Sequence, residues 1–266
     1  MGNVHLDNYL RVIVVVLPAT LERLELEISR REKQFSAMSD PDKDELLGLS
    51  YLYSTNQLWA TCDALRTLEF LSHKSPETLQ VNVTQNGVAG LLRQALEALA
   101  TFDWLNDYSS NDTAEKKAHS YQLADLNERA NYYRDLGDDS EYQQTLGYLE
   151  SARKLGLERG YTRKETDSRG KVILSQEIAL LGPTVLCMRI FTPSSVITAE
   201  VLKHYRGMEN ASWLYRWSSG LAHGKYWVNL FSPAKGDLKK TVPNYLNLSV
   251  LLLTLISQID LAIGTN

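Results

Sequence analysis

Apolar residues recur at helical spacing along most of the chain, and this pattern constrains the fold more than any other feature. In the segment 84–108 they follow one another at intervals of three or four residues, at Leu92, Leu96, Leu99, Phe102 and Leu105. Similar spacing predicts further helices over 20–35, 41–72, 113–135, 140–158, 194–206, 208–223 and 243–263. Strand-like alternation is not sustained anywhere, and 81–83 and 171–174 are at most short extended pieces. The sequence therefore predicts an all-α, multi-helix bundle.

Residues that interrupt helices are scarce. Seven Pro and 15 Gly make up 22 of the 266 residues, about 8%, against a usual combined share of about 12%. No linker is long enough to separate two domains. We therefore expect a single helical domain over 1–266, with N-terminal helices in 1–73, the bundle core in 84–158 and C-terminal motif helices in 183–263. The β-branched run before Pro18 is compatible with either a helix or an extended segment.

The longest polar interruption is locally basic. The stretch GLERGYTRKETDSRG holds three glycines, and we expect residues 159–171 to form an exposed basic loop. The wider segment 151–171 carries seven Lys and Arg against three Asp and Glu, a local charge of +4 in a chain whose net charge is −4. An ordinary solvated loop is one interpretation. The other is a surface that holds a nucleic-acid backbone through Arg163, Lys164, Arg169 and Lys171.

Several classes of protein are disfavoured by what the sequence lacks. It contains no phosphate-binding P-loop, no dinucleotide-binding glycine motif, no zinc-protease motif and no nucleophile elbow. Cys62 and Cys187 lie in no metal-binding cluster, which indicates buried thiols of a reduced compartment. The apolar runs 12–17 and 248–263 are too short or too interrupted for a signal peptide or a membrane span. We expect a cytoplasmic protein without membrane association.

No metal or other cofactor is expected. The pattern closest to a metal site is Glu115 and His119, which stand one helical turn apart in a charged stretch. We interpret that stretch as a solvated helix face.

Reactive and aromatic side chains are densest at 204–227, HYRGMENASWLYRWSSGLAHGKYW. Arg216 and His223 are seven residues apart there, so on a helix their side chains lie within about 20° of each other. A guanidinium suits phosphate and an imidazole titrates near neutrality, so the pair could cleave a phosphodiester without metal. Arg66 and His73 have the same spacing, but His73 falls at a helix end, where a cation complements the helix dipole.

Other residues could support this pair. Ser219 lies one turn from both Arg216 and His223, where it could hydrogen-bond either of them or simply allow close helix packing. On the 84–108 helix, Arg93 and Glu97 are four residues apart and share a face. Glu97 could cross the bundle to orient the catalytic pair, or it could form an intrahelical ion pair with Arg93.

The stretch YRWSSGLAHG resembles the C-terminal signature of a group of largely uncharacterised bacterial helical proteins. That signature is a Tyr-Arg pair, a Ser and then His-Gly, and Tyr215 supplies its first position here. Those proteins also carry an upstream helix of the form R-x-x-L-E with a Trp-Leu end, which LLRQALEALATFDWL at 91–105 matches. This resemblance implies a shared helical fold.

More remotely, the same stretch is similar to HEPN domains, which are helical bundles, commonly dimeric, whose R-x4–6-H motif often serves metal-independent RNA cleavage in toxin and phage-defence systems. The resemblance implies that Arg216 and His223 are catalytic, that RNA is the substrate, and that a homodimer and an antitoxin-like partner are involved. Trp217 stands where the HEPN pattern usually has a polar residue. The alternative is a non-catalytic helical interaction or regulatory module that binds a protein or nucleotide partner.

Overall fold

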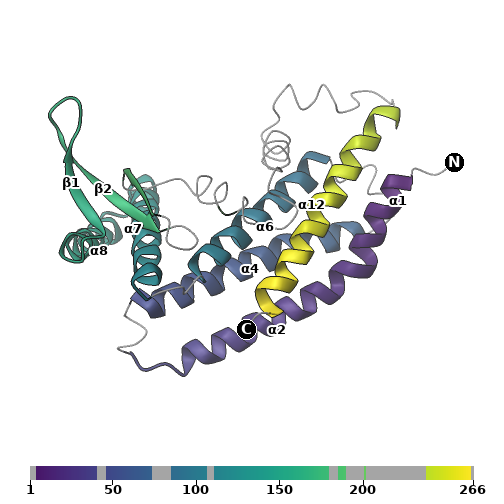
Figure 1. Cartoon of the computed structure of the whole chain (residues 1–266), viewed down its shortest axis with the longest axis horizontal. Helices are drawn as coiled ribbons and strands as arrows, with labels where there is room; N and C mark the ends of the chain where they lie inside the picture. Colours follow the sequence, from purple (N-terminus) through teal and green to yellow (C-terminus); the bar gives the residue numbers. More distant parts are fainter. Residues whose placement is uncertain are drawn as a thin grey trace. The chain divides into compact units, whose positions relative to one another are not determined.

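The computed structural model describes residues 4–40, 46–73, 85–106, 111–179, 185–189, 201 and 238–264. Most of these residues are helical, which confirms the all-α multi-helix bundle (Figure 1). By its internal contacts the chain forms two compact units. Unit 1 comprises Met1–Ser36, Thr55–Asp103 and Thr198–Asn266, and unit 2 comprises Ala37–Ser54 and Trp104–Ile197. The single domain expected over 1–266 stays a prediction.

The N-terminal segment of unit 1 is helical throughout its described part. It contains α1 (Val4–Arg11), a π-helical turn η1 (Val12–Val16) and α2 (Leu17–Ser36). The β-branched run whose structure the sequence left open is therefore the π-helical turn. The helix widens here because Pro18 has no backbone N–H, so the regular pattern of i to i−4 hydrogen bonds cannot continue through it. Just before it, the N–H of Leu17 donates to the carbonyl of Val12, five residues back.

Three longer helices also contribute to unit 1: α4 (Leu46–His73), from Thr55 onward, α6 (Gln85–Leu105), up to Asp103, and α12 (Leu238–Gly264). Their apolar stripes and that of α2 form the core of unit 1, which includes Leu21, Leu24, Ile28, Leu58, Leu65, Leu92, Leu96, Leu99, Phe102, Leu251, Leu255 and Ile259. The helical periodicity of the sequence thus identified the buried faces correctly. Within the described ranges, no helix combines the length and the apolar character needed to span a bilayer.

Unit 2 is built on an antiparallel pair of helices, α7 (Asn111–Leu136) and α8 (Asp139–Glu158). The chain turns between them at Gly137, whose φ of 77° lies in the left-handed region that favours glycine. Asp138 then caps α8 by accepting a hydrogen bond from the backbone N–H of Glu141 at 3.1 Å. The two helices bury one shared apolar cluster, Leu123, Leu126, Leu149 and Ala152.

A small antiparallel sheet follows α8, in the order β1-β2-β3. Its strands are β1 (Thr162–Thr166), β2 (Val172–Ala179) and β3 (Val185–Arg189). The prediction of an exposed loop over 159–171 is therefore wrong for β1, which pairs residue by residue with β2. The extended piece expected at 171–174 is confirmed from Val172 onward.

Other predicted elements lie outside the described residues. These are the extended piece at 81–83 and the helices at 194–206 and 208–223, apart from Val201, which is helical and buried.

Candidate functional site

The β1–β2 hairpin closes through a turn built on Asp167. Its Oδ1 atom accepts hydrogen bonds from the backbone N–H groups of Arg169 and Lys171, each at 2.9 Å. The N–H of Gly170 donates to the carbonyl of Asp167 at 2.9 Å, and the φ of Gly170 is 75°. A glycine in this conformation after a tight turn is typical of three-residue hairpin loops. The turn places the side chains of Arg169 and Lys171 at the exposed end of the hairpin.

All four cations predicted to hold nucleic acid are exposed, and three of them have no ion pair within the described ranges. The side chains of Lys164, Arg169 and Lys171 are exposed, and none forms an ion pair with another residue of the described ranges. Arg163 differs, because its guanidinium pairs with the carboxylate of Glu177. Among the described residues, Lys164, Arg169 and Lys171 therefore have no ion pair, whereas Arg163 is paired with Glu177. The same hairpin also carries the carboxylates of Glu165 and Asp167.

The base of the hairpin is tied to α7 through Glu115. The hydroxyl of Tyr161 donates to Glu115 Oε2 at 2.7 Å, and Arg159 Nη1 donates to the same atom at 3.0 Å. Gly160, with a φ of 73°, ends α8 and allows the chain to turn into β1. Glu115 is therefore a structural anchor rather than part of a metal site.

His119 is fully buried, which corrects the expectation of a solvated helix face. Its Nε2 lies 3.0 Å from the carbonyl oxygen of Ala152, so the ring donates to α8. Its Nδ1 is buried and has no hydrogen-bond partner within the described part of the chain. Burial lowers the pKa of His119 below its usual range, although the bond to Ala152 opposes this effect. Among the described residues, no cluster of three or more His, Cys, Asp or Glu could hold a metal ion.

Gly156 lets α7, α8 and β1 approach closely around this histidine. A Cβ atom at Gly156 would lie 2.5 Å from two ring atoms of His119 and 2.7 Å from Thr162 Oγ1. Thr162 pairs with Gln176 across the hairpin, and both side chains are buried. Polar residues therefore form the buried side of the hairpin here, where strands usually place apolar ones.

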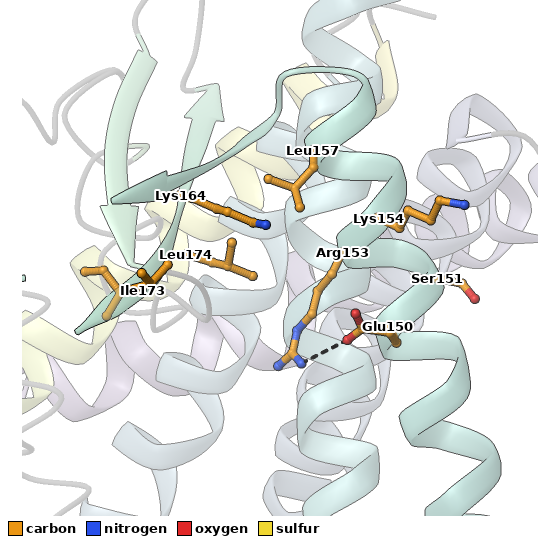
Figure 2. Close-up of a pocket in the computed structure, with 9 residues that line it drawn as sticks. Glu150, Ser151, Arg153, Lys154, Leu157, Lys164, Ile173 and Leu174 are labelled. Carbon is orange, nitrogen blue, oxygen red and sulfur yellow. Dashed lines mark ion pairs between the residues drawn. The ribbon is translucent and has the colours of Figure 1, made fainter. Parts of the chain in front are cut away.

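A pocket of about 420 Å³ lies between α8 and the hairpin (Figure 2). Its walls are formed by Glu150, Ser151, Arg153, Lys154, Leu157, Lys164, Val172, Ile173 and Leu174. Three of these side chains are cationic and one is anionic. The sequence identified Lys164 as a candidate contact, but it missed the pocket because the hairpin was interpreted as a loop.

The supporting pair Arg93 and Glu97 forms the ion pair that one of the two interpretations predicted. Arg93 Nη2 lies 2.8 Å from Glu97 Oε1, and its Nε donates to the same oxygen at 2.9 Å. A second role for Glu97 in orienting the catalytic pair stays a prediction, because Arg216 and His223 lie outside the described residues. Tyr215 and Ser219 also lie outside them.

The rival Arg66–His73 pair contains an arginine with structural partners. Arg66 Nη2 lies 2.6 Å from Glu25 Oε1, and its Nη1 lies 2.8 Å from Glu69 Oε2. Cys62, on the same helix, is buried, and burial followed by the charge of Glu25 raises the pKa of its thiol to about 11. Cys62 is therefore a protonated core thiol at neutral pH.

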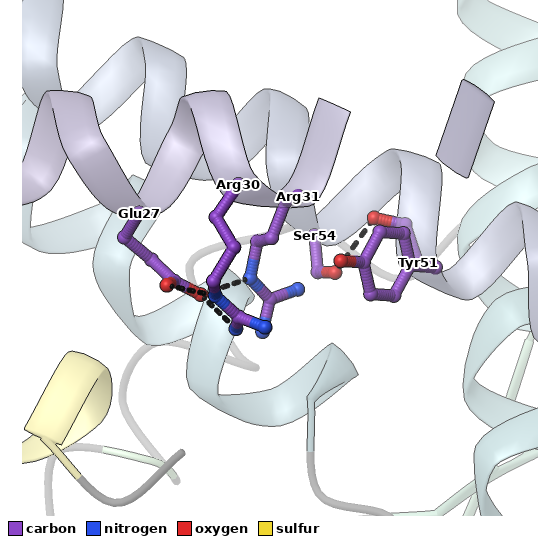
Figure 3. Close-up of polar contacts among 5 residues, drawn as sticks. All are labelled: Glu27, Arg30, Arg31, Tyr51 and Ser54. Atoms are coloured by element: carbon purple, nitrogen blue, oxygen red, sulfur yellow. Dashed lines mark hydrogen bonds and ion pairs between the residues drawn. The ribbon is translucent and has the colours of Figure 1, made fainter. Parts of the chain in front are cut away.

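Unit 1 contains a charged cluster that the sequence analysis did not single out. The buried carboxylate of Glu27 accepts two hydrogen bonds from Arg30, each at 2.7 Å, and one from Arg31 Nε at 2.9 Å (Figure 3). Arg31 is buried as well, and its guanidinium lies 4.9 Å from the ring centroid of Phe102. The spacing of three and four residues on one helix was the available signal.

No protein-family model, curated protein or solved structure matches the chain. The resemblance to HEPN domains accordingly stays a prediction, and the candidate site rests on the residues and geometry given above.

Proposed function

We propose that the chain is a cytoplasmic, HEPN-like, metal-independent endoribonuclease of a bacterial toxin or phage-defence system. In this proposal Arg216 and His223 form the catalytic pair, with Tyr215, Ser219, Arg93 and Glu97 supporting them. Two copies form a homodimer that brings two catalytic faces into one cleft, and an antitoxin-like partner controls the activity. The basic hairpin holds the RNA backbone.

The observation that carries the proposal is the open positive charge on the hairpin. Lys164, Arg169 and Lys171 have no acidic partner among the described residues, although the chain as a whole has a net charge of −4. A local positive surface on an acidic protein attracts a polyanion at that surface and not elsewhere. RNA supplies such a polyanion in the cytoplasm, and its phosphates are the groups that Lys and Arg bind.

The chemistry follows from the two side chains of the motif. His223 accepts the proton of a ribose 2′-hydroxyl, and the resulting oxygen attacks the adjacent phosphorus. The bond from phosphorus to the 5′-oxygen breaks, and that oxygen takes up a proton. The products are a 2′,3′-cyclic phosphate and a 5′-hydroxyl. Arg216 stabilises the negative charge that develops on the phosphoryl oxygens.

Cleavage of a single-stranded RNA in EDTA tests the nuclease directly. The wild type is expected to cut, and His223→Ala and Arg216→Ala are each expected to be slower by at least about 100-fold. Arg66→Ala is the control, because it removes the arginine of the rival pair. Cleavage that persists in His223→Ala, or is absent from the wild type, would contradict the mechanism.

RNA binding is tested separately by its salt dependence. Lys171→Gln removes an open cation, so the slope of log K against log salt should fall by about 0.7 for single-stranded RNA. Arg163→Gln should change it less, because Arg163 already pairs with Glu177. Lys33→Gln, an exposed residue of α2, is the matched control and should leave the slope unchanged. Equal slopes in wild type and Lys171→Gln would exclude a phosphate contact there.

A non-catalytic module that binds a protein partner is the second candidate. The observation that favours it is the exposure of large side chains on α7 and α8, where Tyr132, Leu136 and Tyr148 are 62%, 62% and 50% accessible. Apolar and aromatic side chains at the surface are typical of protein interfaces. In that case RNA is not cleaved, and Leu136→Ser weakens partner binding instead.

A further inference from the structure

The pocket between α8 and the hairpin is lined by both aliphatic and charged side chains. Four of its nine lining residues are aliphatic: Leu157, Val172, Ile173 and Leu174. They are only partly covered, and Val172 is 62% exposed. A ligand that covers these accessible aliphatic side chains removes them from water, and this burial of apolar surface favours binding.

Lys164 supplies a positive charge at this aliphatic wall. It stands opposite Leu174 in the β1–β2 register, and Figure 2 shows its side chain extending from β1 towards α8, between Leu174 and Leu157. It forms no ion pair with the described residues. Its exposed ammonium group is accessible to an anionic ligand that lies against the aliphatic wall.

The second cation of the pocket is Arg153 on α8. Its Nη1 lies 3.6 Å from Glu150 Oε2, a distance too long for a good hydrogen bond. The Glu150 side chain is 77% exposed, so water screens this pair. Figure 2 shows Ser151 and Lys154 directed away from the hairpin, whereas Lys164 extends towards α8 and Arg153 lines the pocket with its guanidinium directed towards Glu150.

We propose that this pocket binds a small amphiphilic anion, with a carboxylate or phosphate head on an aliphatic body. Lys164 binds the head and Arg153 adds a second positive charge, while Leu157, Leu174 and Val172 cover the aliphatic chain. The lining residues include no aromatic side chain on which a nucleobase could stack. The proposal does not require RNA cleavage, although Lys164 is also one of the hairpin cations proposed to hold the RNA backbone.

Calorimetric titration of the full chain with a series of fatty-acid anions tests the aliphatic part. Butyrate, hexanoate and octanoate carry the same head and differ only in chain length. Each added methylene that enters the pocket is expected to lower Kd by about fourfold. Comparing the Kd of hexyl phosphate with that of hexanoate distinguishes a preference for a phosphate head from a preference for a carboxylate head.

Two variants test the two halves of the site. Lys164→Gln should weaken octanoate binding by at least about tenfold, because a charge-assisted hydrogen bond is lost. Val172→Ser should reduce the dependence on chain length and change butyrate binding little. Lys33→Gln removes an exposed lysine charge from α2, and it should change neither the affinity for octanoate nor the dependence of affinity on chain length. Circular dichroism of each variant verifies that the fold is kept.

Three results would overturn the proposal. They are the absence of octanoate binding, an affinity that does not depend on chain length, and equal binding by wild type and Lys164→Gln. Tighter binding of adenosine monophosphate than of octanoate would also overturn it, and would assign the pocket to nucleotides. None of these results depends on whether the chain cleaves RNA, so the failure of one proposal is distinguishable from the failure of the other.

Discussion

Glu27 in unit 1 and His119 in unit 2 are polar side chains that are kept buried in different ways. In unit 1 the buried carboxylate of Glu27 is charged and accepts three hydrogen bonds from Arg30 and Arg31. In unit 2 the ring of the buried His119 hydrogen-bonds the carbonyl of Ala152 and packs closely against Gly156 and the ring of Tyr161. The comparison teaches that the charge of Glu27 is stabilised by matched hydrogen-bonding partners, whereas the neutral ring of His119 is accommodated mainly by close packing.

The difference gives the two units different responses to acid. Burial raises the pKa of Glu27, but the hydrogen bonds and charges of Arg30 and Arg31 outweigh it and hold the pKa below 4.5. The stability that Glu27 contributes is therefore present above pH 4.5 and is lost as the pH falls through the lower, folded pKa. His119 has a lowered pKa, so the unfolded chain takes up its proton first, and stability falls once the pH drops below about 6.5.

The largest expected effect is that of Glu27→Gln. The substitution removes the carboxylate charge that accepts hydrogen bonds from Arg30 and from the buried Arg31, which costs about 3 kcal/mol. The measurement is the free energy of unfolding in urea at pH 7. A loss below about 1 kcal/mol would show that the cluster behaves as a surface ion pair.

A double variant tests whether the effect of Glu27→Gln arises from an unpaired buried charge. Replacing both Glu27 and Arg31 with apolar residues, as Glu27→Leu with Arg31→Met, removes the buried charges together. The double variant should be more stable than Glu27→Gln, because burying an uncompensated charge costs more than removing a pair. The opposite order would show that the charges act independently.

Gly156→Ala tests the packing around His119. The new methyl group would lie 2.5 Å from the ring of His119, which is buried and cannot move away freely. We expect a loss of about 2 kcal/mol and a lower Tm. Gly147→Ala on the same helix is the matched control, since nothing lies within 4 Å of its added methyl group. It should be neutral or more stable by up to about 1 kcal/mol, because alanine favours the helix.

The helices could be predicted from the sequence because their apolar stripes are long and regular. The helix expected at 20–35 is α2, Leu17–Ser36, and that expected at 140–158 is α8, Asp139–Glu158. The hairpin was missed for a physical reason. Its buried side uses Thr162 and Gln176, so β1 lacks the apolar alternation that marks a strand. The Asp-Ser-Arg-Gly turn was the available signal.

The candidate site was predicted only in part. Lys164, Arg169 and Lys171 are exposed as the composition of their segment suggested, but the pairing of Arg163 with Glu177 joins residues 14 apart through strand register. His119 was expected at the surface because charged residues flank it in the sequence. Its burial depends on the packing of α7 against α8, which cannot be predicted from the residues that surround His119 in the sequence.

The smallest expected effect concerns the titration of His119. In the wild type, the free energy of unfolding should fall by at most about 1 kcal/mol between pH 6.5 and 5.5, because the unfolded chain binds the proton more readily than the buried ring does. His119→Gln keeps a donor for the carbonyl of Ala152 but does not titrate, so its stability should not follow this decline. Urea unfolding at the two pH values measures the difference. A parallel decline in both proteins would assign the acid sensitivity to other groups, and unit 2 would then resemble unit 1 in depending on its carboxylates.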